Sequence, residues 1–141
     1  MRCEVLPTLC LPPLRYPSPM SFHPRSLLYV PATSARMLAS AGRRGADALV
    51  LDLEDAIAPA QKAQARAMLQ PAIASLRGQC PVLVRINADR ALAQADTEAA
   101  LQAGCDGLVI PKVESAADVQ RIAALADNHG SPPVLLQAIV E

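Results

Sequence analysis

The stretch that most constrains the fold of this chain is A-L-V-L-D-L-E-D-A, which spans residues 48–56. It begins as a continuous apolar run, which is typical of a strand buried on both faces of a parallel sheet. It then gives way to Asp52, Glu54 and Asp55. In α/β sheets and barrels, the carboxyl ends of parallel strands carry the chemistry. The run therefore predicts a buried strand that ends in a candidate site, although the same acids also suit a solvated loop or a helix start.

Four further segments repeat this pattern of a strand-like run next to a helical one. The apolar runs that predict strands stand at residues 26–30, 81–87, 108–110 and 134–140. Helices are expected over residues 33–45, 59–78, 96–104 and 115–130, each ending at a glycine. Alternation at intervals of roughly 20–35 residues indicates βα repeats, and right-handed crossovers would place all the strands parallel and in sequence order. The prediction is an α/β fold: a curved parallel sheet of five strands with helices on its outer face.

Composition and charge exclude several classes of partner. The formal net charge is +0, and no basic cluster is interleaved with aromatic residues, so nucleic acid is not expected to bind. No apolar run approaches the roughly 20 residues that a membrane span needs. The cysteines lack C-x-x-C spacing, which favours reduced thiols in a cytoplasmic protein; they are Cys3, Cys10, Cys80 and Cys105. Both histidines are isolated, so a metal would be held by oxygen ligands.

The first 19 residues differ from the rest of the chain. They are crowded with prolines and show no periodic apolar stripe. Glu4 and the prolines interrupt the apolar stretch, and no A-x-A cleavage site follows, which argues against a signal peptide. We expect residues 1–19 to be a disordered extension and residues 20–141 to form the domain. Met20 is an alternative start of the protein.

Among the polar residues near the strand ends, Arg85 is the least compatible with a simple solvated position. It stands inside the strand pattern V-L-V-R-I-N. A guanidinium in a strand is almost never buried without a partner. Two interpretations stay open: an ion pair with Asp52 or Glu54, or a fork of donors for a carboxylate or a developing enolate oxygen. Lys112 and Glu114 follow the fourth strand and suit a salt bridge at the rim, which would contribute little.

Absent motifs narrow the chemistry further. The chain has no G-x-G-x-x-G, no P-loop, no G-x-S-x-G and no H-x-x-x-H. Dinucleotide redox chemistry and a serine nucleophile are therefore poorly supported.

Several ordered blocks of the sequence resemble the HpcH/HpaI aldolase and citrate lyase β-subunit family. The resemblance runs from about Arg25 to the end of the chain. The matching blocks are R-S-L-L-Y-V-P-A at residues 25–32, G-A-D-A-L-V-L-D-L-E-D-A at 45–56, K-x-x-A-R at 62–66, V-R-I-N at 84–87 and I-P-K-V-E-S at 110–115. Several blocks in the family's order are far more specific than any one of them alone.

The resemblance implies the first half of a TIM (β/α)8 barrel, truncated after strand five, since a barrel typically needs about 250 residues. It implies a Mg²⁺-dependent carbon–carbon lyase that acts on a hydroxyacyl-CoA thioester or a related hydroxy or oxo acid through an enolate. It also implies a small-molecule substrate and a homo-oligomer in the full-length family. Two alternatives are a half-barrel without activity of its own and an acyl-CoA thioester hydrolase of the same family.

The resemblance also implies roles for individual residues. Arg85 matches the arginine that holds the substrate carbonyl and carboxylate, as a catalytic and substrate-binding residue. Glu54 and Asp55 match the acidic pair that lines the same mouth and are the other catalytic candidates. Glu141 falls at the family's metal and substrate glutamate, although the block reads I-V-E where the family has I-E-T. The family's second metal carboxylate, an aspartate beyond the next strand, has no counterpart in these residues.

Overall fold

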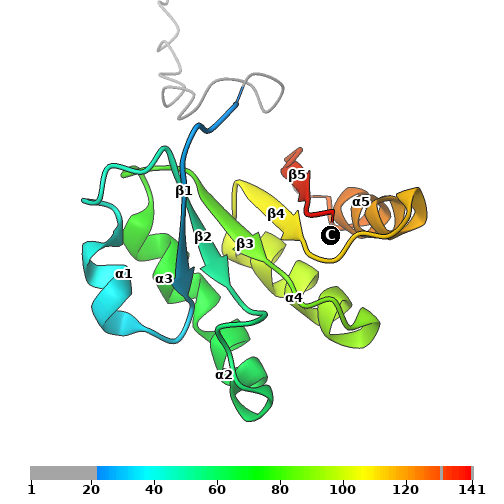
Figure 1. Ribbon diagram of the computed structural model, residues 1–141, viewed down its shortest axis with the longest axis horizontal. Coiled ribbons are helices and arrows are strands. Elements are labelled where there is room, and N and C mark those ends of the chain that lie inside the picture. Colours follow the sequence, from blue (N-terminus) through cyan, green and yellow to red (C-terminus); the bar gives the residue numbers. More distant parts are fainter. Residues whose placement is uncertain (1–21, 131, 141) are drawn as a thin grey trace, which may run out of the picture.

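A computed structural model of the chain describes residues 22–130 and 132–140. Within these residues, the strands form one parallel sheet in the order β1-β2-β3-β4-β5 (Figure 1). The strands are β1 (Leu27–Pro31), β2 (Ala48–Asp52), β3 (Val82–Arg85), β4 (Gly107–Ile110) and β5 (Leu135–Ala138). The predicted parallel βα arrangement in sequence order is confirmed. The expected N-terminal extension, residues 1–19, lies outside the described residues.

The helices stand between consecutive strands and pack on one face of the sheet (Figure 1). They are α1 (Ala35–Ala41), the 3-10 turn η2 (Pro59–Gln61), α2 (Lys62–Ala67), α3 (Leu69–Leu76), α4 (Arg90–Ala103) and α5 (Ala116–Asn128). None of the helices in the described part of the chain is long and apolar enough to cross a membrane. Strand, helix and next parallel strand repeat as they do in the first part of a (β/α)8 barrel.

Two predicted helix starts are confirmed by their capping contacts. Ser34 caps α1, because its side chain accepts a hydrogen bond from the backbone N–H of Met37. Ser115 and Asp118 form a capping box at the start of α5. These contacts satisfy backbone donors that have no partner inside the helix.

Three predicted helix boundaries were wrong. The first helix ends at Ala41 rather than near Gly45. The single helix expected over residues 59–78 is divided into η2, α2 and α3, with Met68 between the last two. Pro71 explains this division, because a proline ring clashes with the carbonyl four residues earlier, here that of Ala67, the last residue of α2. The helix expected to begin at residue 96 begins at Arg90 instead.

The N-cap of α4 is Asp89, whose carboxylate accepts hydrogen bonds from the backbone N–H groups of Ala91 and Leu92. Asp96 therefore lies inside the helix, where it is fully buried. Its role is described below.

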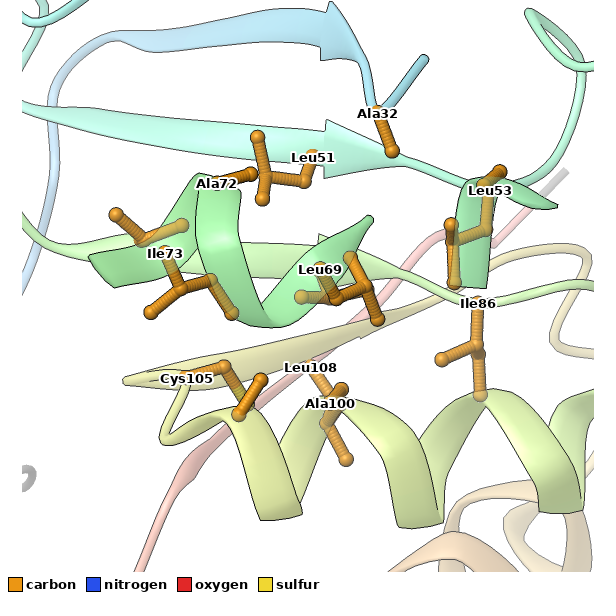
Figure 2. Packing of buried hydrophobic residues seen from close by; sticks show 14 of the residues in the cluster. Ala32, Leu51, Leu53, Leu69, Ala72, Ile73, Ile86, Ala100, Cys105 and Leu108 are labelled. Carbon is orange, nitrogen blue, oxygen red and sulfur yellow. The ribbon is translucent and has the colours of Figure 1, made fainter. Parts of the chain in front are cut away.

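The main hydrophobic core fills the space between the sheet and the helices (Figure 2). Leu51 and Leu108 from the strands meet Leu69 and Ile73 of α3 there (Figure 2). The core consists of leucine, valine, isoleucine and alanine with Cys105, as the near absence of aromatic residues requires. Burial raises the pKa of the Cys105 thiol to about 12, so this thiol stays protonated and packs as an apolar side chain.

The opposite face of the sheet has a smaller apolar cluster of its own. It is formed by Ala48, Val50, Leu83 and Val109, all fully buried. Side chains alternate between the two faces of a strand. Asp52, two residues after Val50, and Arg85, two residues after Leu83, therefore point to this same face. The charged residues at the strand ends therefore stand at the end of this second face, away from the helices.

Gly107 allows β4 and β5 to approach closely. A Cβ atom at this position would lie 2.8 Å from the backbone carbonyl oxygen of Leu135 and 3.2 Å from Cγ of Leu83. The carbonyl belongs to the neighbouring strand and cannot turn away as a side chain can. We expect Gly107→Ala to lower the free energy of unfolding by about 1–3 kcal/mol, the usual penalty of overpacking, as measured by urea denaturation.

Gly42→Ala is the matched control. Its Cβ would meet the side chain of Gln79, which is flexible and can move, and Gly42 has ordinary right-handed backbone angles. We expect this change to alter stability by less than about 0.5 kcal/mol. Equal losses for the two variants would contradict the close approach of β4 and β5.

Candidate functional site

Asp52 and Arg85 are brought together by the register of the sheet. The last residue of β2 is paired directly with the last residue of β3, and both side chains emerge on the same face. Arg85 donates from Nε to Oδ1 of Asp52 at 2.8 Å and from Nη2 to Oδ2 at 2.6 Å. This two-point contact is the strong form of an arginine–carboxylate pair. The interpretation of Arg85 as an ion-pair residue is thus confirmed.

The loop after β2 wraps around the Asp52 carboxylate. The backbone N–H groups of Glu54 and Ala56 donate to its two oxygens at 2.8 and 3.1 Å. Burial by itself raises the pKa of Asp52, but the hydrogen bonds from Arg85 and from these two N–H groups bring it below its ordinary value. The hydrogen bond to Asp52 raises the pKa of Arg85 in turn. Both members of the pair therefore stay ionised over the physiological range.

Glu54 is a buried carboxylate held between two cations. Its Oε2 lies 3.3 Å from Nη1 of Arg85, and its Oε1 lies 2.9 Å from Nζ of Lys112. Only 6% of the residue is exposed, and neither oxygen receives a hydrogen bond of good geometry. The positive charges of Arg85 and Lys112 therefore stabilise the buried Glu54 carboxylate. Its oxygens are still able to accept a hydrogen bond.

Asp55 stands at the surface of the same cluster. Its side chain is 66% exposed, and its Oδ2 accepts a hydrogen bond from Nη1 of Arg85 at 3.3 Å. Its other oxygen, Oδ1, lies 3.9 Å from Nζ of Lys112. The structure thus brings together three of the predicted site residues, Arg85, Glu54 and Asp55. The fourth, Glu141, lies outside the described residues.

Lys112 belongs to this cluster in a way that the sequence did not indicate. It follows β4 after Pro111 and adopts a left-handed backbone with φ of 49°. Such a conformation is uncommon for a residue other than glycine and is found at sites where the surroundings enforce it. Its ammonium contacts the buried carboxylate of Glu54, so it is more than the rim residue that its position after the strand suggested.

Two further side chains support the cluster and were missed as site residues. Lys62 donates from Nζ to the backbone carbonyl groups of Leu53 and Glu54, and so fixes the loop that carries the acids. The guanidinium of Arg85 lies over the ring of Tyr29, 5.1 Å from its centroid, at a cation–π distance. Lys62 and Tyr29 both fall in the sequence blocks quoted above, but no spacing rule connects them to Arg85.

A second buried network lies behind the end of β3. Asp96 is 0% exposed, and its Oδ1 accepts a hydrogen bond from Nε of Arg66 at 2.9 Å. Its Oδ2 accepts from the backbone N–H and the side-chain Nδ2 of Asn87 at 2.9 and 2.6 Å. Asn87 stands two residues after Arg85. The network therefore ties α2 and α4 to the loop that leaves the candidate site.

The described residues do not by themselves form a magnesium site. Among them, no group of three or more histidine, cysteine, aspartate or glutamate side chains could hold a metal ion. The physical reason is that Asp52, Glu54 and Asp55 face Arg85 and Lys112. Carboxylates neutralised in this way are poor ligands for a cation that demands ordered oxygen octahedra.

Comparisons with known proteins bear on the family and the fold of the chain. The family model described as HpcH/HpaI aldolase/citrate lyase matches residues 25–131. A (3S)-malyl-CoA thioesterase of Cereibacter sphaeroides is 41% identical over 109 residues, which cover 75% of this chain and 38% of that protein. Citrate lyase subunit beta of Leuconostoc mesenteroides is 36% identical over 103 residues, which cover 72% of this chain and 34% of that protein.

A solved structure shares the fold as well as the sequence. CitE from Mycobacterium tuberculosis, in complex with magnesium and acetate, superposes with a TM-score of 0.64 at 35% identity. The match covers 82% of this chain and 43% of that chain. The chain spans about two fifths of the length of the curated relatives it matches. The blocks at the strand ends, the parallel βα repeats and the match over residues 25–131 agree, and the chain belongs to the HpcH/HpaI aldolase/citrate lyase family.

Proposed function

We propose that the protein carrying this sequence is a carbon–carbon lyase that acts on a hydroxyacyl-CoA thioester or a related hydroxy acid. The observation that carries the proposal is the ionised Arg85, fixed by Asp52 at the carboxyl ends of β2 and β3. Cleavage of a β-hydroxyacyl compound leaves an enolate, so its site must stabilise negative charge on oxygen as it forms. A guanidinium that is already oriented performs this task without rearranging during the reaction.

The hydrogen-bonding capacity of Arg85 is compatible with a ligand. A guanidinium has five N–H donors, and the contacts with Asp52 use one on Nε and one on Nη2. The remaining donors are on Nη1 and Nη2, and the contacts of Nη1 with Glu54 and with the exposed Asp55 are both long, at 3.3 Å. Arg85 can therefore be both the buried ion-pair residue and a donor to substrate, which joins the two interpretations of the sequence.

Glu54 and Asp55 are proposed to act on protons of the substrate. Oε1 of Glu54 faces Lys112, whereas Oε2 lies beside Arg85 without a hydrogen bond of good geometry, so Oε2 is able to accept one from a substrate hydroxyl group or a water molecule that enters the cluster. In retro-aldol or Claisen cleavage, removal of the hydroxyl proton accompanies formation of the carbonyl product while the bonding electrons pass to the enolate. General-base catalysis of this kind typically contributes about 10²–10⁴-fold.

Mg²⁺ is proposed as the cofactor, with Glu141 as a ligand. The support is the complex of a solved relative with magnesium and the oxygen-rich character of the strand ends. When bound, Mg²⁺ would supply Lewis-acid stabilisation of the same negative oxygen. The described residues do not complete such a site, and none of the roles given to Arg85, Glu54 or Asp55 depends on the metal.

Thioester hydrolysis is the second candidate function. It is favoured by the 41% identity with a (3S)-malyl-CoA thioesterase. An arginine that stabilises an enolate can also stabilise the oxyanion that forms when water attacks a thioester.

An assay with (3S)-malyl-CoA separates these candidates, because each reaction gives a different pair of products. Cleavage yields glyoxylate and acetyl-CoA, whereas hydrolysis yields malate and the free thiol of CoA. We expect glyoxylate formation in the presence of Mg²⁺ and its loss on addition of EDTA. Release of thiol without glyoxylate would replace the lyase by the hydrolase, and the absence of both products with this and other hydroxyacyl-CoA substrates would contradict both activities.

A further inference from the structure

Two cationic side chains of α2 reach the loops that carry the candidate site. Lys62 and Arg66 stand four residues apart on this helix, so their side chains leave from the same face. In Figure 1, α2 lies beyond the carboxyl end of β2, whereas α3 packs beside the sheet. The break at Met68 separates the two helices and lets α2 take its own direction.

Lys62 holds the loop that follows β2. Its Nζ donates to the backbone carbonyl oxygen of Leu53 at 2.8 Å and to that of Glu54. Both contacts are partly buried, and a buried acceptor that loses its donor is costly to leave unpaired. Because the second carbonyl belongs to Glu54 itself, the ammonium of Lys62 fixes the backbone from which the Glu54 carboxylate extends.

Arg66 holds the loop that follows β3, through the carboxylate of Asp96. Nε of Arg66 donates to Oδ1 of Asp96 at 2.9 Å, and this contact orients a carboxylate that is fully buried. Oδ2 of Asp96 then accepts a hydrogen bond from the backbone N–H of Asn87 at 2.9 Å. Asn87 stands two residues after Arg85, so this chain of contacts leads from α2 to the backbone next to the guanidinium of the site.

The separation of the Glu54 carboxylate from the Arg85 guanidinium is not set by a hydrogen bond between them. Oε2 of Glu54 lies 3.3 Å from Nη1 of Arg85, and neither oxygen of Glu54 has a hydrogen-bond partner of good geometry. Attraction between charges is weakly directional and does not fix two side chains at one distance. The separation therefore depends on where the two loops are held, and α2 is anchored to both.

We propose that Lys62 and Arg66 are positioning residues, through which α2 sets the distance between the Glu54 carboxylate and the Arg85 guanidinium. Lys62 acts through the backbone of the loop after β2, and Arg66 acts through Asp96. The consequence for catalysis rests on the proposed function. The hold of α2 on the two loops rests only on the contacts described above.

Amide hydrogen exchange of the full chain, followed by NMR, tests this hold without an assay of activity. The reporters are the N–H groups of Glu54 and Ala56 after β2 and that of Asn87 after β3. Lys62→Met removes the ammonium and keeps an unbranched side chain. Exchange at Glu54 and Ala56 should become at least about tenfold faster, with less than about a twofold change at Asn87. Arg66→Met should give the reverse pattern.

Two further variants keep this test interpretable. Gln64→Met is the matched control, because Gln64 is an exposed residue of the same helix. It should change exchange at every reporter less than about twofold. Arg66→Gln replaces Arg66→Met if the latter does not fold, since glutamine keeps an N–H donor at the place of Nε. It should accelerate exchange at Asn87 by about two- to tenfold and leave Glu54 unchanged.

Turnover of a hydroxyacyl-CoA substrate tests the consequence for catalysis. Lys62→Met should lower kcat about 10- to 100-fold and change KM less than about threefold, because a misplaced catalytic group weakens the transition state more than binding. A variant that combines Lys62→Met with Arg66→Gln should be little slower than Lys62→Met, since both changes disturb the same pair of groups. Thermal melting should confirm that each variant is folded.

Three outcomes would overturn the proposal. The first is exchange at Glu54 and Ala56 that is no faster in Lys62→Met than in Gln64→Met. The second is an Asn87 amide that does not respond to either change of Arg66. The third is an unchanged kcat of folded Lys62→Met in a protein with measurable turnover. A protein without turnover that shows the expected exchange pattern would contradict the proposed function and support the hold of α2 on both loops.

Discussion

Arg85→Lys is expected to lower turnover by the protein carrying this sequence about 100- to 1,000-fold, the usual effect of removing one donor to a developing oxyanion. Lysine keeps the positive charge but not the planar fork. In the present structure, Nε and Nη2 of this fork donate to Asp52. Nη1 faces the exposed side of the cluster, where it contacts Asp55. A lysine at this position cannot serve both sides, so it would pair with the buried carboxylate and leave the substrate oxygen without a donor.

The same change should also destabilise the fold, and the two effects can be measured separately. We expect a loss of about 1–3 kcal/mol in the free energy of unfolding, because one acceptor of Asp52 loses its partner in a buried position. Arg121→Lys is the matched control: its contact with Asp118 is long, at 3.9 Å, and lies within one helix, so neither stability nor turnover should change appreciably. Near-normal turnover of folded Arg85→Lys would show that Arg85 is only a structural ion-pair residue.

Asp96→Ala is expected to cause the largest loss of stability, about 3–5 kcal/mol in the free energy of unfolding. The substitution removes the acceptor of three hydrogen bonds from a site with no exposure to solvent. It strands the guanidinium of Arg66, whose side chain is 22% exposed, together with the two N–H donors of Asn87. Urea denaturation at neutral pH measures the loss through a lower midpoint at unchanged slope.

Two comparisons test the cause of this loss. Glu98→Ala, two residues along the same helix and exposed, should change stability by less than about 0.5 kcal/mol. Combining Asp96→Leu with Arg66→Met should lose less stability than Asp96→Leu alone, because no unpaired charge remains buried. If the double variant were as unstable as the sum of the two single ones, the pair would not be coupled, and the network would have to be reassigned.

The order and direction of the strands could be predicted from the sequence, because they follow from local pattern. Runs such as Ala48–Asp52 and Val82–Arg85 are apolar throughout, and right-handed crossovers leave one arrangement for parallel strands that alternate with helices. The capping residues Ser34 and Ser115 could be identified for the same reason, since a cap contacts a backbone group only a few residues away. The helix boundaries at Met68 and Arg90 differ from the predicted ones because Pro71 breaks the helical hydrogen bonds near Met68 and Asp89 caps a helix that starts earlier.

The sequence by itself determined which residues stand at the strand ends: Glu54 and Asp55 follow β2, and Arg85 closes β3. Only the tertiary structure decided which of them meet. The register that places Asp52 opposite Arg85 is set by the packing of two apolar faces, and a shift by one residue would turn one of these side chains to the other face. The approach of Lys112 to Glu54 depends on a left-handed backbone after β4. A lysine carries no local signal for that conformation, which the surrounding contacts must impose.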